Sequence, residues 1–173
     1  MSTSLLVLNA GNSNVQTAFW DGVSFHGLAS KPSSQLSDSD FPEGVPCAAA
    51  SVAGPYVEAL LRSHGAFILS PEGKNGINLE RMDSSTLGAD RLANAIALAS
   101  TGPLPALCVD FGTAITFEVL DEGAALLGGA ILPGRRLQRL ALREHTAKLP
   151  LTELRAAPQP MPGCSTTRWP GFS

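Results

Sequence analysis

The chain lacks the features that mark membrane-spanning, secreted and nucleic-acid-binding proteins. No apolar run approaches the roughly 20 residues that a bilayer-spanning helix needs. The opening Met-Ser-Thr-Ser has none of the charge that begins a signal peptide. The 12 Lys and Arg residues are outnumbered by 15 Asp and Glu residues, so the net charge of −3 offers no basic surface for phosphate backbones. We therefore expect neither a membrane nor a nucleic-acid partner.

Cysteine is scarce as well. Cys47, Cys108 and Cys164 are odd in number, and their separations match no metal-binding spacing. The first two lie in apolar runs, where cysteine commonly serves as a small core residue. Because free thiols are typical of reducing compartments, we expect a cytoplasmic protein without a metal–sulfur site.

The apolar residues that are present make up 44% of the 173, and they follow the periods of strands and helices. An Asp21-Gly22 pair predicts a hairpin, Pro55 predicts a helix start and Gly65 its end. In chain order we expect strands at 4–10, 15–20 and 23–28, a polar connection at 30–43, a strand at 45–52, a helix of about ten residues from 55, a strand at 67–69 and a helix at 89–100. Strands at 106–111, 114–120 and 124–132 follow, and then a helix from 134 to about 148 on which Leu137, Leu140 and Ala141 form an apolar row.

The order of these elements repeats itself. A group of strands followed by helices occurs twice, which predicts two related α/β lobes, each built on a mixed sheet. We assign residues 1–102 to the first lobe and residues 103–150 to the start of the second. Residues 151–173 contain several prolines and little periodicity, and they are interpreted as an irregular tail.

Two short segments share a pattern that suits a phosphate-rich ligand. Residues 9–14 (Asn-Ala-Gly-Asn-Ser-Asn) and residues 110–116 (Asp-Phe-Gly-Thr-Ala-Ile-Thr) each follow an apolar strand and contain a glycine among small polar side chains. Such a turn presents backbone N–H groups and hydroxyls without side-chain bulk. One copy alone would also fit an ordinary hairpin between core strands. Two copies, with Gly88-Ala89-Asp90-Arg91 between them, favour a split phosphate-binding site.

These segments, together with Gly-Gly-Ala-Ile-Leu-Pro-Gly at 128–134, give the chain a specific resemblance. In order and spacing it resembles the type III pantothenate kinases of the acetate and sugar kinase/Hsp70/actin superfamily, over about residues 5–29 and 76–167. The resemblance implies an α/β fold of two ribonuclease H-like lobes, the second incomplete. It also implies a homodimer if the fold is complete.

The resemblance assigns the nucleotide to the two turns. ATP would be bound by Asn9, Ala10, Gly11, Asn12, Ser13 and Asn14 of the first turn and by Gly112, Thr113 and Thr116 of the second. Asp110 would hold a metal, with Mg²⁺ accompanying ATP and a monovalent cation such as K⁺ or NH₄⁺ nearby. The chain departs from the family at Asn9, where the family has an aspartate. An amide oxygen is a weaker partner for Mg²⁺ than a carboxylate.

The acceptor substrate, pantothenate, would lie at the segment between the turns. Asp90 is the candidate general base, because a carboxylate can orient an alcohol and accept its proton. The alternative is a helix-start aspartate that only stabilises the helix dipole. Gly88, Ala89 and Arg91 would bind pantothenate, whose carboxylate suits the planar guanidinium. The resemblance adds Thr166, which would reach the substrate across a dimer interface.

The leading hypothesis is therefore ATP-dependent phosphorylation of pantothenate to 4'-phosphopantothenate, the first step of coenzyme A biosynthesis. The second is a non-catalytic, truncated or regulatory member of the family that binds nucleotide or pantothenate without turnover, which Asn9 and the expected lack of C-terminal elements favour. A third is another small-molecule kinase or phosphatase of the superfamily, which rests on fold analogy alone.

Overall fold

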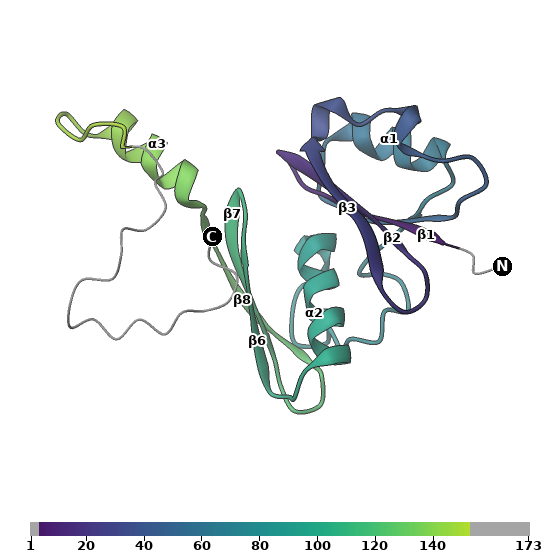
Figure 1. The fold of residues 1–173 in the computed structure, drawn as a ribbon. Helices are drawn as coiled ribbons and strands as arrows, with labels where there is room; N and C mark the ends of the chain where they lie inside the picture. The colour runs from purple at the N-terminus through teal and green to yellow at the C-terminus, as the bar shows by residue number, and fades with distance from the viewer. Residues whose placement is uncertain (1–3, 153–173) are drawn as a thin grey trace, which may run out of the picture.

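The computed structural model describes residues 4–152, which form two β-sheets with a helix between them (Figure 1). The first sheet has five strands in the order β3-β2-β1-β4-β5. Its strands are β1 (Leu5–Ala10), β2 (Asn14–Trp20), β3 (Phe25–Pro32), β4 (Cys47–Ser51) and β5 (Phe67–Ile68). Strands β1, β2 and β3 pair antiparallel, whereas β1 with β4 and β4 with β5 pair parallel. This sheet is mixed, as the sequence predicted.

The second sheet is smaller and purely antiparallel. It contains β6 (Ala106–Phe111), β7 (Ala114–Leu120) and β8 (Leu126–Pro133) in chain order. The prediction of a mixed sheet here was wrong for the described residues, because three strands joined by short turns can only run up and down.

Three α-helices accompany the sheets over residues 4–152. Helix α1 (Pro55–Ser63) begins at a proline and connects the parallel strands β4 and β5. Helix α2 (Ala89–Thr101) contacts β4 of the first sheet and β6 and β7 of the second. Helix α3 (Arg135–His145) follows β8 and ends before the predicted 148. No helix in this part of the chain is long and apolar enough to cross a membrane.

Two separate hydrophobic clusters hold the sheets. The first lies under the five-stranded sheet and includes Leu6, Leu8 and Leu61. The second lies between α2 and the three-stranded sheet and includes Leu92, Leu120 and Leu126. All six side chains are at most 2% exposed. Each sheet therefore has a core of its own, and α2 lies between them.

The hairpin turn between β2 and β3 forms at Asp21-Gly22, as the sequence predicted. The carboxylate of Asp21 accepts hydrogen bonds from the backbone N–H groups of Val23 and Ser24, at 2.8 and 2.9 Å, and Gly22 has a φ of 99°. Strand β3, however, continues to Pro32 through residues that the sequence assigned to a polar connection. It is an edge strand exposed on both faces, so it shows no apolar alternation.

Candidate active site

The first glycine turn joins β1 to β2 and is braced from one side. Gly11 donates its N–H to the carbonyl of Asn14 at 3.0 Å. Ser33, which is 6% exposed, donates its hydroxyl to the carbonyl of Gly11 at 2.7 Å, and its N–H to the carbonyl of Ser13 at 3.0 Å. The carbonyls of this turn thus accept hydrogen bonds within the protein, whereas the side chains of Asn12, Ser13 and Asn14 are exposed. Sequence analysis had not identified Ser33, which lies in a polar stretch without a motif.

The second glycine turn joins β6 to β7 and is braced by the start of α3. Gly112 donates its N–H to the carbonyl of Ala114 at 2.8 Å, and Gly134 donates to the carbonyl of Thr113 at 2.9 Å. A Cβ at Gly134 would overlap the carbonyl oxygens of Gly112 and Thr113. The glycine before α3 is therefore required by close packing against the turn.

This packing gives a stability prediction with a matched control. Gly54 and Gly134 both precede a helix with nearly the same backbone, φ −68° and ψ 173° against φ −67° and ψ 166°. A Cβ at Gly54 meets no atom within 4 Å. We expect Gly134→Ala to destabilise the protein by about 1–3 kcal/mol more than Gly54→Ala. Thermal unfolding measures the difference, and equal melting temperatures for the two variants would contradict it.

The two turns meet, although 100 residues separate them in the sequence. The hydroxyl oxygens of Ser13 and Thr113 lie 2.8 Å apart, and both side chains are exposed. The structure therefore brings together the two segments that the sequence pattern singled out. Asn9, at the end of β1, is also exposed, whereas the methyl group of Ala10 is buried, so Ala10 could offer a ligand only its backbone.

The strands that flank the second turn present polar side chains on one face. Pairing places Asp110 opposite Thr116 and Cys108 opposite Glu118, on the side of the sheet that α2 covers. Asp110 is exposed, while Thr116 is 8% exposed. The Thr116 hydroxyl is buried and has no hydrogen-bond partner among the described residues. A buried hydroxyl without a partner is costly, so it indicates a ligand atom or water at this position.

Helix α2 brings Asp90 and Arg91 to the same region. Asp90 is partly buried in the first turn of the helix, and its carboxylate accepts a hydrogen bond from the backbone N–H of Arg91 at 2.8 Å. A Cβ at Gly88 would lie 2.5 Å from that carboxylate, so glycine there leaves Asp90 its space. The side chain of Ala89 is buried in the fold. Among the predicted substrate residues that the structure describes, Ala89 could thus offer a ligand only its backbone.

Arg91 is not an isolated cation. Its Nε donates to Glu118 at 2.8 Å and its Nη2 donates to the carbonyl of Phe117 at 3.1 Å. Asn94 donates to Glu118 and to Asp110, each at 3.4 Å. Glu118 was missed by sequence analysis. The signal for it was an acidic residue in an otherwise apolar strand, because a buried charge requires a partner.

Acidic side chains outnumber basic ones in this region, where Asp90, Asp110 and Glu118 lie near Arg91, so the local charge is negative. Burial raises the pKa of the Cys108 thiol, and the charges of Glu118 and Asp110 raise it further. Such a potential favours a bound cation. Over residues 4–152, no group of three or more His, Cys, Asp and Glu side chains could hold a metal ion. A cation held by Asp110 would therefore take its other ligands from phosphate oxygens and water, as Mg²⁺ commonly does.

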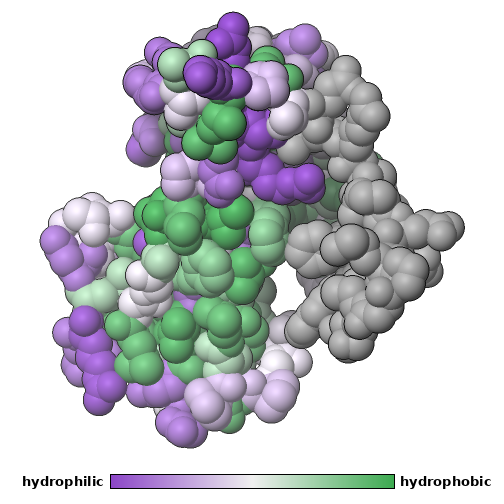
Figure 2. Space-filling model, turned by 90° about the vertical axis from the view of Figure 1, so that its left-hand side faces the viewer, coloured by the Kyte–Doolittle hydropathy of each residue, from purple (hydrophilic) through white to green (hydrophobic). Residues whose placement is uncertain are grey.

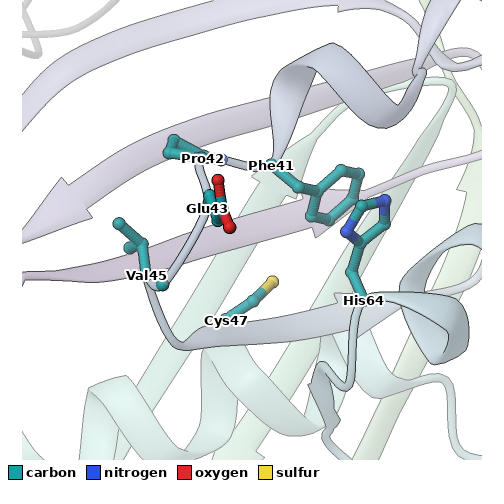
Figure 3. A pocket seen from close by; sticks show the side chains of 7 residues that line it. Phe41, Pro42, Glu43, Val45, Cys47 and His64 are labelled. Carbon is teal, nitrogen blue, oxygen red and sulfur yellow. The ribbon is translucent and has the colours of Figure 1, made fainter.

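A separate pocket of about 300 Å³ lies beside the start of β4, at the end of this strand that is away from the first glycine turn (Figure 3). Phe41, Glu43, Cys47 and His64 are among the residues that line it. Burial raises the pKa of Cys47 to about 11, so the thiol stays protonated at neutral pH and is a poor nucleophile. The pocket contains none of the predicted site residues. Thr166 and Cys164 lie outside the described residues.

Fold and site together define a mixed α/β protein whose two sheets meet at paired glycine turns. A sequence profile described as Type III pantothenate kinase matches residues 5–168. The chain belongs to the type III pantothenate kinase family.

Individual relatives agree with this assignment. The chain is 35% identical over 173 residues to a type III pantothenate kinase of Legionella pneumophila, covering 87% of this chain and 67% of the relative. It is 42% identical over 87 residues to that of Methylacidiphilum infernorum, covering 50% of this chain and 32% of the relative. Among solved structures, one described as a Baf family transcriptional activator from Campylobacter jejuni superposes with a TM-score of 0.59 at 22% identity, covering 90% of this chain and 68% of that one. This last similarity supports the fold alone.

Proposed function

We propose that the chain is a kinase that transfers the γ-phosphate of ATP to pantothenate, forming 4'-phosphopantothenate in coenzyme A biosynthesis. The observation that carries the proposal is the contact between Ser13 and Thr113, because it joins the two glycine turns at one place. Family membership supplies the substrates. The fold would be that of two ribonuclease H-like lobes, the first at residues 1–102 and the second beginning with residues 103–150; the two separate cores support this division.

The turns would bind the phosphates of ATP. Gly11 and Gly112 keep side chains away from the two turns, and Ser13, Thr113 and Thr116 offer hydroxyls. The unpartnered Thr116 hydroxyl fits such a ligand. Asp110 would hold Mg²⁺ or a monovalent cation, which when bound neutralises phosphate charge. Phosphoryl transfer depends mainly on positioning the phosphates and neutralising their charge.

The acceptor would be activated by Asp90. Its carboxylate would take the proton of the primary hydroxyl of pantothenate as the oxygen bonds to the γ-phosphorus, while the bond from that phosphorus to the β-phosphate oxygen breaks and ADP leaves. Arg91 would bind the pantothenate carboxylate. We propose that Thr166 completes this site from a partner subunit.

A coupled assay for ADP release, with and without pantothenate, tests the function. We expect release that depends on both ATP and pantothenate. The second candidate, a member that binds without turnover, is favoured by Asn9, which places an amide where the family has a carboxylate. It predicts pantothenate binding in calorimetry with no pantothenate-dependent release of ADP.

A homodimer in the cytoplasm is the assembly that we propose. The face of the molecule shown in Figure 2 carries a broad apolar surface. On the second sheet, Leu107 is 54% exposed and its neighbour Val119 is 37% exposed, and on α3 Leu140 is 40% exposed. The apolar row that the sequence predicted on α3 is thus present, and none of the described residues buries it. Apolar surface of this extent is typical of an interface.

Charge placed on this face should break the dimer. We expect Leu107→Glu to convert the parent dimer to a monomer of 18.0 kDa in sedimentation, because an ion pair partner is absent from an apolar interface. Val23→Glu is the control, since Val23 is an apolar residue, 86% exposed, in the turn before β3. A parent that is monomeric, or a Leu107→Glu variant that stays dimeric, would contradict the proposal.

A further inference from the structure

Glu118 is a buried charged group that phosphoryl transfer, as proposed above, does not use. Its side chain is fully buried at the centre of β7. No other Asp, Glu, Lys or Arg among residues 4–152 is buried. Burying a carboxylate is costly unless it is paired and hydrogen-bonded. A buried ion pair is often no more stabilising than apolar side chains of the same volume, so stability alone explains it poorly.

Both oxygens of this carboxylate are occupied by residues of α2. Arg91 Nε donates to Oε1 at 2.8 Å, and Asn94 donates to Oε2 at 3.4 Å. The carbonyl of the preceding residue, Phe117, accepts from Arg91 Nη2 at 3.1 Å. The guanidinium plane is therefore fixed by two acceptors from one strand, and its side chain is only 12% exposed.

Strand β8 provides the space for the guanidinium. Gly129 pairs with Glu118 in the sheet, and a Cβ there would lie 2.7 Å from Arg91 Nη2 and would overlap the carbonyl oxygen of Phe117. The arginine thus lies over the β7–β8 pair at Gly129, where a side chain would occupy its space. This explains the second glycine of the Gly128-Gly129 pair.

The network leaves part of Arg91 for a ligand. The two hydrogens of Nη1 make no hydrogen bond to any described residue. The backbone N–H of the same residue donates to Asp90, the candidate base. The orientation of the Arg91 guanidinium is therefore set by β7, and the hydrogen bond from the backbone of Arg91 holds the carboxylate of the adjacent residue, Asp90.

We infer that Glu118 is a positioning residue, which holds Arg91 in the orientation that binds the carboxylate of the acceptor substrate. The inference rests on the proposed function, because it assigns pantothenate to Arg91. Glu118 itself touches no substrate. Its carboxylate forms charge-assisted hydrogen bonds, which are shorter and stronger than those of an amide.

The test compares Glu118→Gln with the parent, in the full chain. We expect the KM for pantothenate to rise about tenfold while the KM for ATP and kcat stay within a few-fold, because the loss falls on acceptor binding alone. In an Arg91→Ala background, Glu118→Gln should have no further effect on the KM for pantothenate. Glu122→Gln is the control, since Glu122 is an exposed carboxylate in the turn that follows β7.

A merely structural role gives a different result. It would lower the melting temperature and the active fraction of Glu118→Gln but leave the KM for pantothenate at the parent value. In the Arg91→Ala background, Glu118→Gln would then lower the melting temperature further. That outcome overturns the inference. If the parent binds pantothenate in calorimetry but releases no ADP, the proposed function fails, and the dissociation constants then decide the role of Glu118. A parent that binds no pantothenate overturns both.

Discussion

Asp90→Asn is expected to reduce pantothenate phosphorylation by roughly 10²–10⁴-fold, the range that a positioned general base contributes. The amide keeps the shape of the side chain but cannot take the proton of the acceptor hydroxyl. Its oxygen can still accept the N–H of Arg91, which Asp90 accepts at 2.8 Å, so the start of α2 should remain intact. The rate is measured by coupled ADP release, and ATP binding by calorimetry should be nearly unchanged.

Asp83→Asn is the matched control for this loss. Asp83 is an exposed aspartate that accepts a backbone N–H from Ser85 at 3.0 Å, just before a short 3-10 helix at 84–86. It shares the local hydrogen bond of Asp90 but lies outside the candidate site. If both variants keep a rate within a few-fold of the parent, Asp90 serves only to start α2.

Asn9→Asp is expected to raise turnover, by about tenfold or more, and most clearly at limiting Mg²⁺. The change is isosteric and adds one negative charge at the end of β1, beside the first glycine turn. Asn9 is exposed and its backbone pairs with Gln16 and Ala50, so the strand should tolerate the new side chain. The measurement is kcat as a function of Mg²⁺ concentration.

A second asparagine-to-aspartate substitution nearby provides the control. Asn12→Asp also adds a charge near the phosphates, but within the turn rather than at the strand end. We expect it to weaken ATP binding by like-charge repulsion rather than to raise turnover. Equal responses of the two variants, or no response of Asn9→Asp at any Mg²⁺ concentration, would show that the missing carboxylate does not limit the reaction.

The sequence predicted what local rules determine. Strands β6 and β7 were placed without error because their ends coincide with Gly112 and with clear apolar runs. Helix α2 was placed within a residue because Leu92, Ala95 and their neighbours recur with the helical period. The two glycine turns were identified as a pair, and the structure places them in contact.

What the sequence could not predict depends on contacts between distant elements. The Arg91–Glu118 pair joins residues 27 apart and depends on how α2 is rotated against β7. Ser33 braces the first turn from a stretch that carries no periodicity. The row of apolar residues on α3 indicated a buried face, but periodicity cannot show whether anything covers that face.

The alternation of side chains in β6 and β7 has a consequence for how the site can change. Residues Asp110, Thr116 and Glu118 lie on one face of the sheet, and Leu107 and Val109 lie on the other. Because a strand repeats every two residues, shifting the pairing by a single position would exchange the faces. A slip of β7 by one residue would direct apolar side chains toward Arg91 and Asn94 and take the carboxylate of Glu118 away from both. The irregularity in the pairing of β7 with β8 falls between Val119 and Leu120, beyond Glu118, where it does not disturb this alternation. The chemistry of the face behind β6 and β7 thus fixes their register, and changes in this turn should be tolerated only where Asp110 stays paired with Thr116.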